Sequence, residues 1–184
     1  MVLEEISRLS AKLNQLLQFS RPAVRSNEVP GISDAVSVLR EVVVVLRPEA
    51  ERRGIALHFE ATAASIPVST SSEALNDILS NIIVNAAEAA SSGGVIETTV
   101  GAVNGNCLIT IEDDGPGIPP AAKDKILQPF FTTKSQGTGL GLAIVAKRVS
   151  EFSGKVEFES PINAGRGTRF QISLPLAEKA QEAS

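Results

Sequence analysis

Three glycines at alternate positions lead without a break into a segment with helical spacing of apolar residues. Gly137, Gly139 and Gly141 precede the segment 143–148, which reads Ala-Ile-Val-Ala-Lys-Arg. Glycines let backbone N–H groups approach an anion closely, and a helix N-terminus presents unpaired donors with a partial positive charge. The pattern therefore predicts a phosphate-binding turn that opens a helix. Short glycine runs are also found as plain turns, so other segments have to support this interpretation.

The size and composition of the chain exclude several classes of protein. Its 184 residues, 43% of them hydrophobic, suffice for one sizeable domain with an ordinary core. A net charge of −4 and the absence of Trp and Tyr argue against nucleic-acid binding. The longest apolar run, residues 42–46, is far too short to span a bilayer. We expect a cytoplasmic chain without direct membrane contact, whose parent protein is free to carry a membrane anchor.

The pattern of apolar residues divides the chain into three parts. In residues 1–22, apolar side chains alternate at steps of four and three, which predicts one helix over residues 2–20 that ends before Pro22. This helix needs a partner, either a second copy of the chain or its own domain. Residues 23–178 are predicted to form the main domain, and residues 179–184 a disordered tail.

Helices and antiparallel strands are mixed in the main domain, which favours a two-layer α/β sandwich. The first main-domain helix is predicted to begin after a cap at Ser33 or Asp34 and to run towards Arg53, with a kink or break near Arg47 because of Pro48. Further helices are predicted from Ser71 or Ser72 onward, over 121–127, and from the glycines to about residue 153. Strands are predicted over 55–60, around 67–68, and over 95–103, 107–112, 155–160 and 168–174. Asn104-Gly105 is a strong hairpin signal, since both residues tolerate a positive φ. Cys107 is predicted to be a core residue.

Two asparagines on the second main-domain helix are candidates for a polar site. Asn81 and Asn85 lie four residues apart and so point the same way. An amide on an apolar helical face is costly to bury without a partner, and its oxygen is a hard ligand suited to Mg²⁺. Helix capping or surface exposure is the alternative interpretation.

Two further segments carry polar groups next to turn residues. Asp113-Asp114-Gly115-Pro116-Gly117 follows a predicted strand, so its first carboxylate can accept a hydrogen bond from the amine of a base while the glycines let a ring lie close. A simple Asp-Gly turn is the alternative. Residues 129–134, Pro-Phe-Phe-Thr-Thr-Lys, place Lys134 just before the glycines, where its ammonium can reach a phosphate.

The order and spacing of these segments resemble the catalytic domain of sensor histidine kinases, within the superfamily of gyrase, Hsp90 and MutL ATPases. The resemblance covers about residues 30–176 and includes the Gly-Arg-Gly-Thr sequence at 165–168 before the last strand. It implies a mixed, about five-stranded sheet backed by three helices, with ATP and Mg²⁺ bound between the helices and a lid. A helix precedes this domain.

The resemblance also assigns roles to individual residues. Asn85 is expected to be the Mg²⁺ ligand with Asn81 as its companion, and Asp113 to read adenine with Thr168 nearby through a water. Asn81 and Lys134 are the expected catalytic residues. The full set expected to bind the cofactor is Asn81, Asn85, Asp113, Gly115, Gly117, Lys134, Gly137, Thr138, Gly139, Leu140, Gly141, Leu142 and Thr168.

Two positions bear on the type of reaction. The hydrolysing relatives carry a glutamate where Asn81 stands, and an amide is a poor general base, so phosphoryl transfer is favoured over hydrolysis. Many histidine kinases have a lysine where Glu88 stands, and we expect Lys134 to supply that charge instead. The lid is also short, with only Ser135 and Gln136 between Lys134 and Gly137. The glutamate at position 88 and the short lid both resemble the nitrogen-regulation branch of these kinases.

The phosphoacceptor histidine of the family is not recognisable in this sequence. The only histidine, His58, lies in an alternating strand pattern and is expected to be an ordinary strand residue. Residues 1–22 resemble the second helix of a dimerisation hairpin, so we expect a truncated sensor kinase whose partners are a phosphoacceptor hairpin and a response regulator, and which can form a homodimer through residues 2–20. A serine/threonine kinase of the anti-sigma type and a nucleotide-sensing module without transfer are the alternatives.

Overall fold

The computed structural model describes residues 16–17, 31–134 and 137–177. The predicted helix over residues 2–20 and the predicted tail lie outside the described residues, apart from Leu16 and Leu17, which are helical. The described part contains every predicted site residue.

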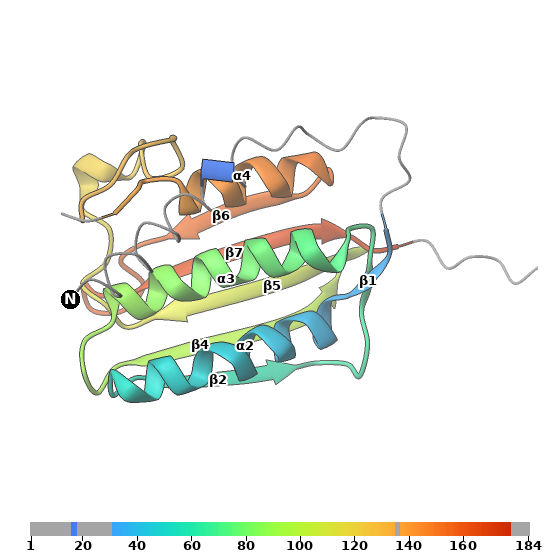
Figure 1. Cartoon of the computed structure of the whole chain (residues 1–184), viewed down its shortest axis with the longest axis horizontal. Helices are drawn as coiled ribbons and strands as arrows, with labels where there is room; N and C mark the ends of the chain where they lie inside the picture. The colour runs from blue at the N-terminus through green and yellow to red at the C-terminus, as the bar shows by residue number, and fades with distance from the viewer. Residues whose placement is uncertain (1–15, 18–30, 135–136, 178–184) are drawn as a thin grey trace, which may run out of the picture.

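The described residues form a five-stranded sheet covered on one face by helices (Figure 1). The strand order is β2-β4-β5-β7-β6, in which β2 pairs parallel to β4 and every other pair is antiparallel. This confirms the predicted two-layer α/β sandwich with a mixed sheet. The strands are β2 (Ala56–Ala61), β4 (Val95–Val103), β5 (Asn106–Asp113), β6 (Lys155–Glu159) and β7 (Thr168–Pro175).

Three helices and a small second sheet complete the fold. The helices are α2 (Ala35–Arg52), α3 (Ser72–Ala89) and α4 (Gly141–Glu151). Strands β1 (Ser33–Asp34) and β3 (Pro67–Val68) pair with each other near the start of α2. In Figure 1, the three helices lie side by side over the larger sheet.

Alternating burial along the central strands creates the core between the layers. Cys107, Ile109 and Ile111 of β5 are each at most 1% exposed and face the helices, whereas the residues between them are half-buried. An apolar stripe of α3 packs on them, as its helical spacing predicts. Burial raises the pKa of the Cys107 thiol to about 12, so this cysteine is an unreactive core residue as predicted.

Local signals set the element boundaries. The Ser71 hydroxyl accepts a hydrogen bond from the Ala74 N–H at 3.2 Å and caps α3. Asn104 and Gly105 have φ values of 50° and 79°, which confirms the predicted tight turn between β4 and β5.

Two predicted features differ from the structure. Helix α2 continues through Pro48, so the predicted break near Arg47 is wrong, whereas the alternative of a kink there stays a prediction. The missing N–H would bond to the carbonyl of Val44, which lies on the exposed side where water can replace the donor. In place of a helix over 121–127 the structure has the 3₁₀ turn η1 (Pro120–Ala122) and single turns after it. The segment is too short to sustain a helix, and Pro129 prevents its extension.

Candidate functional site

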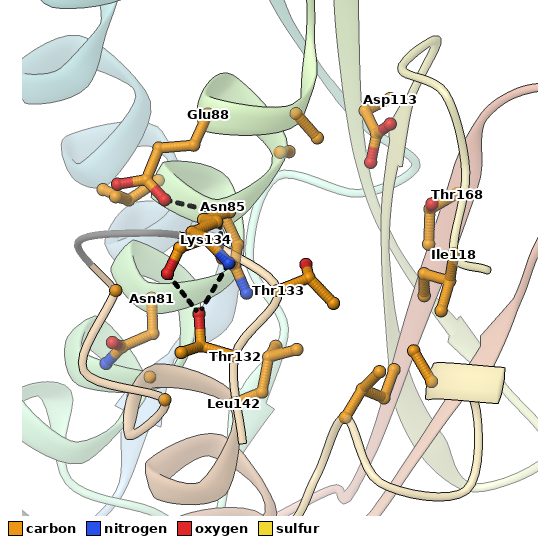
Figure 2. Close-up of a pocket in the computed structure, with 18 of the residues that line it drawn as sticks. Asn81, Asn85, Glu88, Asp113, Ile118, Thr132, Thr133, Lys134, Leu142 and Thr168 are labelled. Carbon is orange, nitrogen blue, oxygen red and sulfur yellow. Dashed lines mark hydrogen bonds and ion pairs between the residues drawn. The ribbon is translucent and has the colours of Figure 1, made fainter. Parts of the chain in front are cut away.

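A cavity of about 770 Å³ lies between α3, the start of α4 and the loops on either side of η1 (Figure 2). It brings together residues from both ends of the main domain, because the glycine segment is folded back against α3. All but two of the predicted site residues line it: Asn81, Asn85, Asp113, Gly117, Lys134, Gly137, Thr138, Gly139, Gly141, Leu142 and Thr168.

Gly115 and Leu140 are the two predicted residues that do not line the cavity. Gly115 lies behind Asp113, where its N–H donates to Asp113 Oδ1 at 2.9 Å and its carbonyl accepts from the Gly167 N–H at 2.7 Å. Leu140 is 1% exposed. In this structure Gly115 orients the Asp113 carboxylate and Leu140 anchors the start of α4 in the core, and their contact with a ligand stays a prediction.

The two asparagines of α3 both face the cavity, as their spacing predicts. The Asn81 amide donates to the carbonyl of Asp77 at 2.7 Å, which directs its oxygen toward α4. A Cβ built on Gly141 would lie 3.1 Å from that oxygen. A side chain at the first residue of α4 would therefore crowd Asn81, so glycine keeps the helix start close to α3.

Lys134 reaches across the cavity to α3. Its ammonium donates to Asn85 Oδ1 at 2.8 Å and lies 2.5 Å from Glu88 Oε2 (Figure 2). Thr132 holds the loop on which Lys134 lies, because its hydroxyl accepts from the Lys134 N–H at 3.1 Å. One cation thus bridges the amide oxygen and the carboxylate of α3.

Asp113 and Thr168 lie together on the side of the cavity opposite Lys134 (Figure 2). They are paired residues of β5 and β7, and Asp113 is 6% exposed. Burial raises the pKa of Asp113 to about 6; the Gly115 N–H works against this and the Asp114 carboxylate adds to it. Above that pH the Asp113 side chain is an ionised carboxylate, which accepts hydrogen bonds. The Gly115 N–H holds one of its oxygens, and the carboxylate borders the cavity.

The loop before α4 depends on a glycine for its conformation. Gly139 has a φ of 68°, and its carbonyl accepts from the Phe130 N–H at 2.9 Å. A Cβ there would lie 2.4 Å from the Phe130 carbonyl carbon, so no other residue fits. Helix α4 begins at Gly141 with no side-chain cap, which leaves its first N–H groups available to an anion at the cavity.

The apolar walls of the cavity were not among the residues predicted from the sequence. They come from the loops on either side of η1 and from β7, and their spacing in the sequence marks them only as core residues. They include Ile118, Ile126, Phe131 and Phe170. An apolar space between these walls, bordered by Asp113, is of the kind that can take an aromatic ring.

The donor set fits a magnesium–nucleotide complex better than a metal held by protein alone. In the described ranges, no group of three or more His, Cys, Asp or Glu is placed to hold a metal ion. Asn85 Oδ1 already accepts from a cation, and an amide oxygen is a hard ligand of the kind Mg²⁺ takes when phosphates and water complete its shell.

The comparison with known proteins gives the family of this fold. Residues 70–178 match the family model described as histidine kinase-, DNA gyrase B-, and HSP90-like ATPase. The chain belongs to this ATPase family. Membership implies an ATP site, and the matched segment holds every predicted binding residue.

Relatives in this ATPase family are sensor and sporulation kinases. Sporulation kinase A of Bacillus subtilis (strain 168) is 30% identical over 174 residues, which cover 95% of this chain and 28% of that kinase. The histidine-protein kinase AtoS of Escherichia coli (strain K12) is 33% identical over 176 residues, with coverage of 95% and 28%. The chain spans 24–40% of the length of the first four relatives.

Solved structures of this family superpose on the chain. The nucleotide-free catalytic domain of histidine kinase ThkA has a TM-score of 0.72 at 32% identity, covering 79% of this chain and 94% of that domain. Full-length ShkA with AMPPNP has a TM-score of 0.80 at 28% identity, with coverage of 95% and 37%. ThkA in complex with the response regulator TrrA has a TM-score of 0.75 at 27% identity, with coverage of 96% and 49%.

Within the described ranges, none of the helices combines the length and apolar character needed to cross a membrane.

Proposed function

We propose that this chain is the ATP-binding core of a two-component sensor histidine kinase. It would transfer the γ-phosphoryl group of ATP to a histidine on a dimerisation hairpin, from which the group passes to an aspartate of a response regulator. The observation that carries the proposal is one cavity with Asp113 and Thr168 on one side and Asn81, Asn85 and the start of α4 on the other.

The two sides of the cavity fit the two ends of ATP. The Asp113 carboxylate would accept from the adenine amine between the apolar walls, with Thr168 nearby. Asn85 would be the protein ligand of Mg²⁺, which would neutralise charge on the phosphates and hold them in one geometry. The N–H groups at the start of α4 and the Lys134 ammonium would contact the phosphates, the latter after leaving Asn85.

The position of Asn81 supports transfer rather than hydrolysis. Its amide nitrogen already donates to the Asp77 carbonyl, and an amide oxygen has no useful basicity at neutral pH. Asn81 would thus help to orient the phosphates but would not activate a water molecule for hydrolysis. The acceptor imidazole supplies the nucleophile, and catalysis consists of positioning and charge neutralisation.

The acceptor histidine would come from outside the catalytic domain. His58, the only histidine of the sequence, is exposed on β2 next to buried Leu57, so it faces away from the helices and the cavity. We assign residues 1–22 to the second helix of a dimerisation hairpin, with a homodimer through residues 2–20. The ThkA complex with its response regulator supports the proposed partner.

Calorimetry with ADP and ATP, with and without Mg²⁺, tests the nucleotide site. We expect micromolar binding, about −8 kcal/mol, that Asp113→Asn abolishes. In that variant the Gly115 N–H holds the amide oxygen, so the amide nitrogen faces the adenine amine and two donors meet. Failure of the folded chain to bind either nucleotide would refute the proposal.

A transfer assay tests the reaction class. With labelled ATP and a separately produced histidine hairpin of a sensor kinase, label should appear on the hairpin in an acid-labile, base-stable form, as a phosphohistidine does. Acid-stable label on a serine or threonine would instead favour the anti-sigma type. Binding without transfer to any hairpin tested, including one from the same parent protein, would favour a nucleotide sensor.

A further inference from the structure

Ser160, which the sequence analysis did not single out, joins the two loops beside the proposed adenine pocket. It follows β6 and is 5% exposed. Its hydroxyl accepts from the Ile118 N–H at 2.7 Å, donates to the Gly167 carbonyl at 3.0 Å, and lies 3.3 Å from Thr168 Oγ1. These three partners belong to both loops that border Asp113 and Thr168.

The direction of each hydrogen bond follows from what each partner can do. The Gly167 carbonyl only accepts, so it takes the single proton of Ser160. The Ile118 N–H only donates, so it uses one lone pair of Ser160. In the remaining contact Thr168 has to be the donor, and Ser160 then makes its full set of one donated and two accepted bonds.

This arrangement sets what Thr168 presents to the cavity. With its proton directed to Ser160, the Thr168 hydroxyl has only lone pairs left for a ligand or a water. Its paired residue Asp113 presents a carboxylate, which also only accepts. The two polar groups at this side of the cavity are therefore both acceptors, and they match a donor such as an exocyclic amine.

We propose that Ser160 is a positioning residue that holds the Thr168 hydroxyl as an acceptor and thereby selects a 6-amino purine over a 6-oxo purine. This rests on the proposed nucleotide site. A 6-oxo base would direct its carbonyl oxygen at two acceptors, the Asp113 carboxylate and the Thr168 hydroxyl. A site whose polar groups accept hydrogen bonds from a ligand binds a ligand without that donor much more weakly. Without Ser160, the Thr168 hydroxyl can turn and donate to such an oxygen.

Ser160 also has a packing role that the test has to separate from this one. A Cβ built on Gly117 would lie 2.9 Å from Ser160 Oγ, and the Lys123 ammonium donates to the Ser160 carbonyl. Loss of the hydroxyl therefore loosens the loop after Asp113. A purely structural change of this kind weakens the binding of both bases alike, whereas a change in polarity alters their ratio.

The experiment is calorimetric titration of ADP and IDP, which differ at the 6 position, into the wild type and Ser160→Ala. We expect the ratio of the ADP affinity to the IDP affinity to fall about fivefold or more in Ser160→Ala. A change of this size corresponds to the loss of one hydrogen bond that distinguishes the two bases. Ser33→Ala is the matched control, because Ser33 is 6% exposed and its hydroxyl has no hydrogen-bond partner in the described part of the chain. It should keep the wild-type ratio.

Two further variants keep the test decisive. Ser160→Cys retains much of the volume but makes only weak hydrogen bonds, so it should also lower the ratio if Ser160→Ala does not fold. In a Thr168→Val background, Ser160→Ala should leave the ratio unchanged, because the effect passes through Thr168.

The outcomes separate the two proposals. Wild-type binding of ADP with an unchanged ratio in both Ser160 variants, or an equal loss for ADP and IDP, overturns the positioning role and leaves the nucleotide site standing. No ADP binding by the folded wild type overturns the nucleotide site, and the inference with it.

Discussion

At the scale of single residues, two charged side chains lie on opposite sides of the cavity. Asp113 is buried and has to stay ionised to accept from a base, whereas Lys134 is partly exposed and bridges two oxygens of α3. Their different exposure makes their contributions separable by experiment.

The first prediction concerns the pH dependence at Asp113. Its pKa of about 6, raised by burial, means that a ligand amine competes with a proton for the carboxylate. We expect the affinity for adenosine, which has no phosphate to titrate, to fall about tenfold per pH unit below the pKa. Equilibrium titrations from about pH 7 down to about pH 5 measure this; a flat profile would contradict the assignment.

The free protein should respond to pH in the opposite sense at this residue. Because the folded-state pKa of Asp113 is raised from its ordinary value of 3.8 to about 6, ionisation of this carboxyl costs stability. Its contribution to the free energy of unfolding is fully present below the lower value and is lost as the pH rises through about 6. Comparison of urea unfolding of the wild type and Asp113→Asn at both ends of this range isolates the contribution.

The second prediction concerns Lys134. Its ion pair with Glu88 is 39% and 45% exposed, so Lys134→Ala should change the free energy of unfolding by less than about 1 kcal/mol. The variant should bind ADP about tenfold more weakly while its adenosine affinity stays unchanged, because a charged contact to phosphate is lost. Lys155→Ala, which breaks another exposed pair, should leave both affinities intact. Equal losses for ADP and adenosine would rule out a phosphate contact.

At the scale of elements, the contact between α3 and α4 holds the two halves of the cavity in register. Asn81 and Asn85 lie on α3, and α4 supplies the proposed phosphate-side N–H groups. Near the other end of this contact, buried Arg148 of α4 lies 3.8 Å from Asp77 of α3 and 3.1 Å from Glu151. Asp77 also accepts from Asn81 through its carbonyl, so this ion cluster is linked to the site.

The third prediction is that Arg148→Met strongly destabilises the domain. The three side chains are only 7–13% exposed, and removal of the arginine takes a buried positive charge away from the Glu151 carboxylate at 3.1 Å and from the Asp77 carboxylate at 3.8 Å. We expect a loss of about 3–5 kcal/mol in the free energy of unfolding. Arg52→Met, whose ion pair with Glu49 is exposed, is the control and should cost little. A loss below about 1 kcal/mol for Arg148→Met would show that the cluster contributes little.

Element-scale predictions from the sequence succeeded where a local signal decides the conformation. Ser71 and the Asn104-Gly105 turn mark a helix start and a hairpin because the side chain or φ preference acts on its own backbone. Pro48 and the 121–127 segment were misjudged because solvent exposure and neighbouring chain decide those cases.

At the scale of the whole molecule, the cavity couples nucleotide binding to folding. It is lined from α3, β5, β7, α4 and the loops between them, so a bound nucleotide connects segments that are distant in the sequence. The fourth prediction is that ADP at about 100 times its dissociation constant raises the free energy of unfolding by about 2.7 kcal/mol. Thermal unfolding at several ADP concentrations measures the shift. Asp113→Asn, which we expect to fold without binding ADP, should show none.

The sequence by itself determined the family, the fold class and most of the proposed site residues, because motifs at fixed spacing and local backbone preferences carry that information. Only the tertiary structure decided which of those residues meet and what orients them. Lys134 reaches Asn85 across 49 positions, and Ser160 reaches Ile118 across 42. No periodicity connects such pairs, since their contact results from the packing of whole elements and from the need to satisfy each buried polar group.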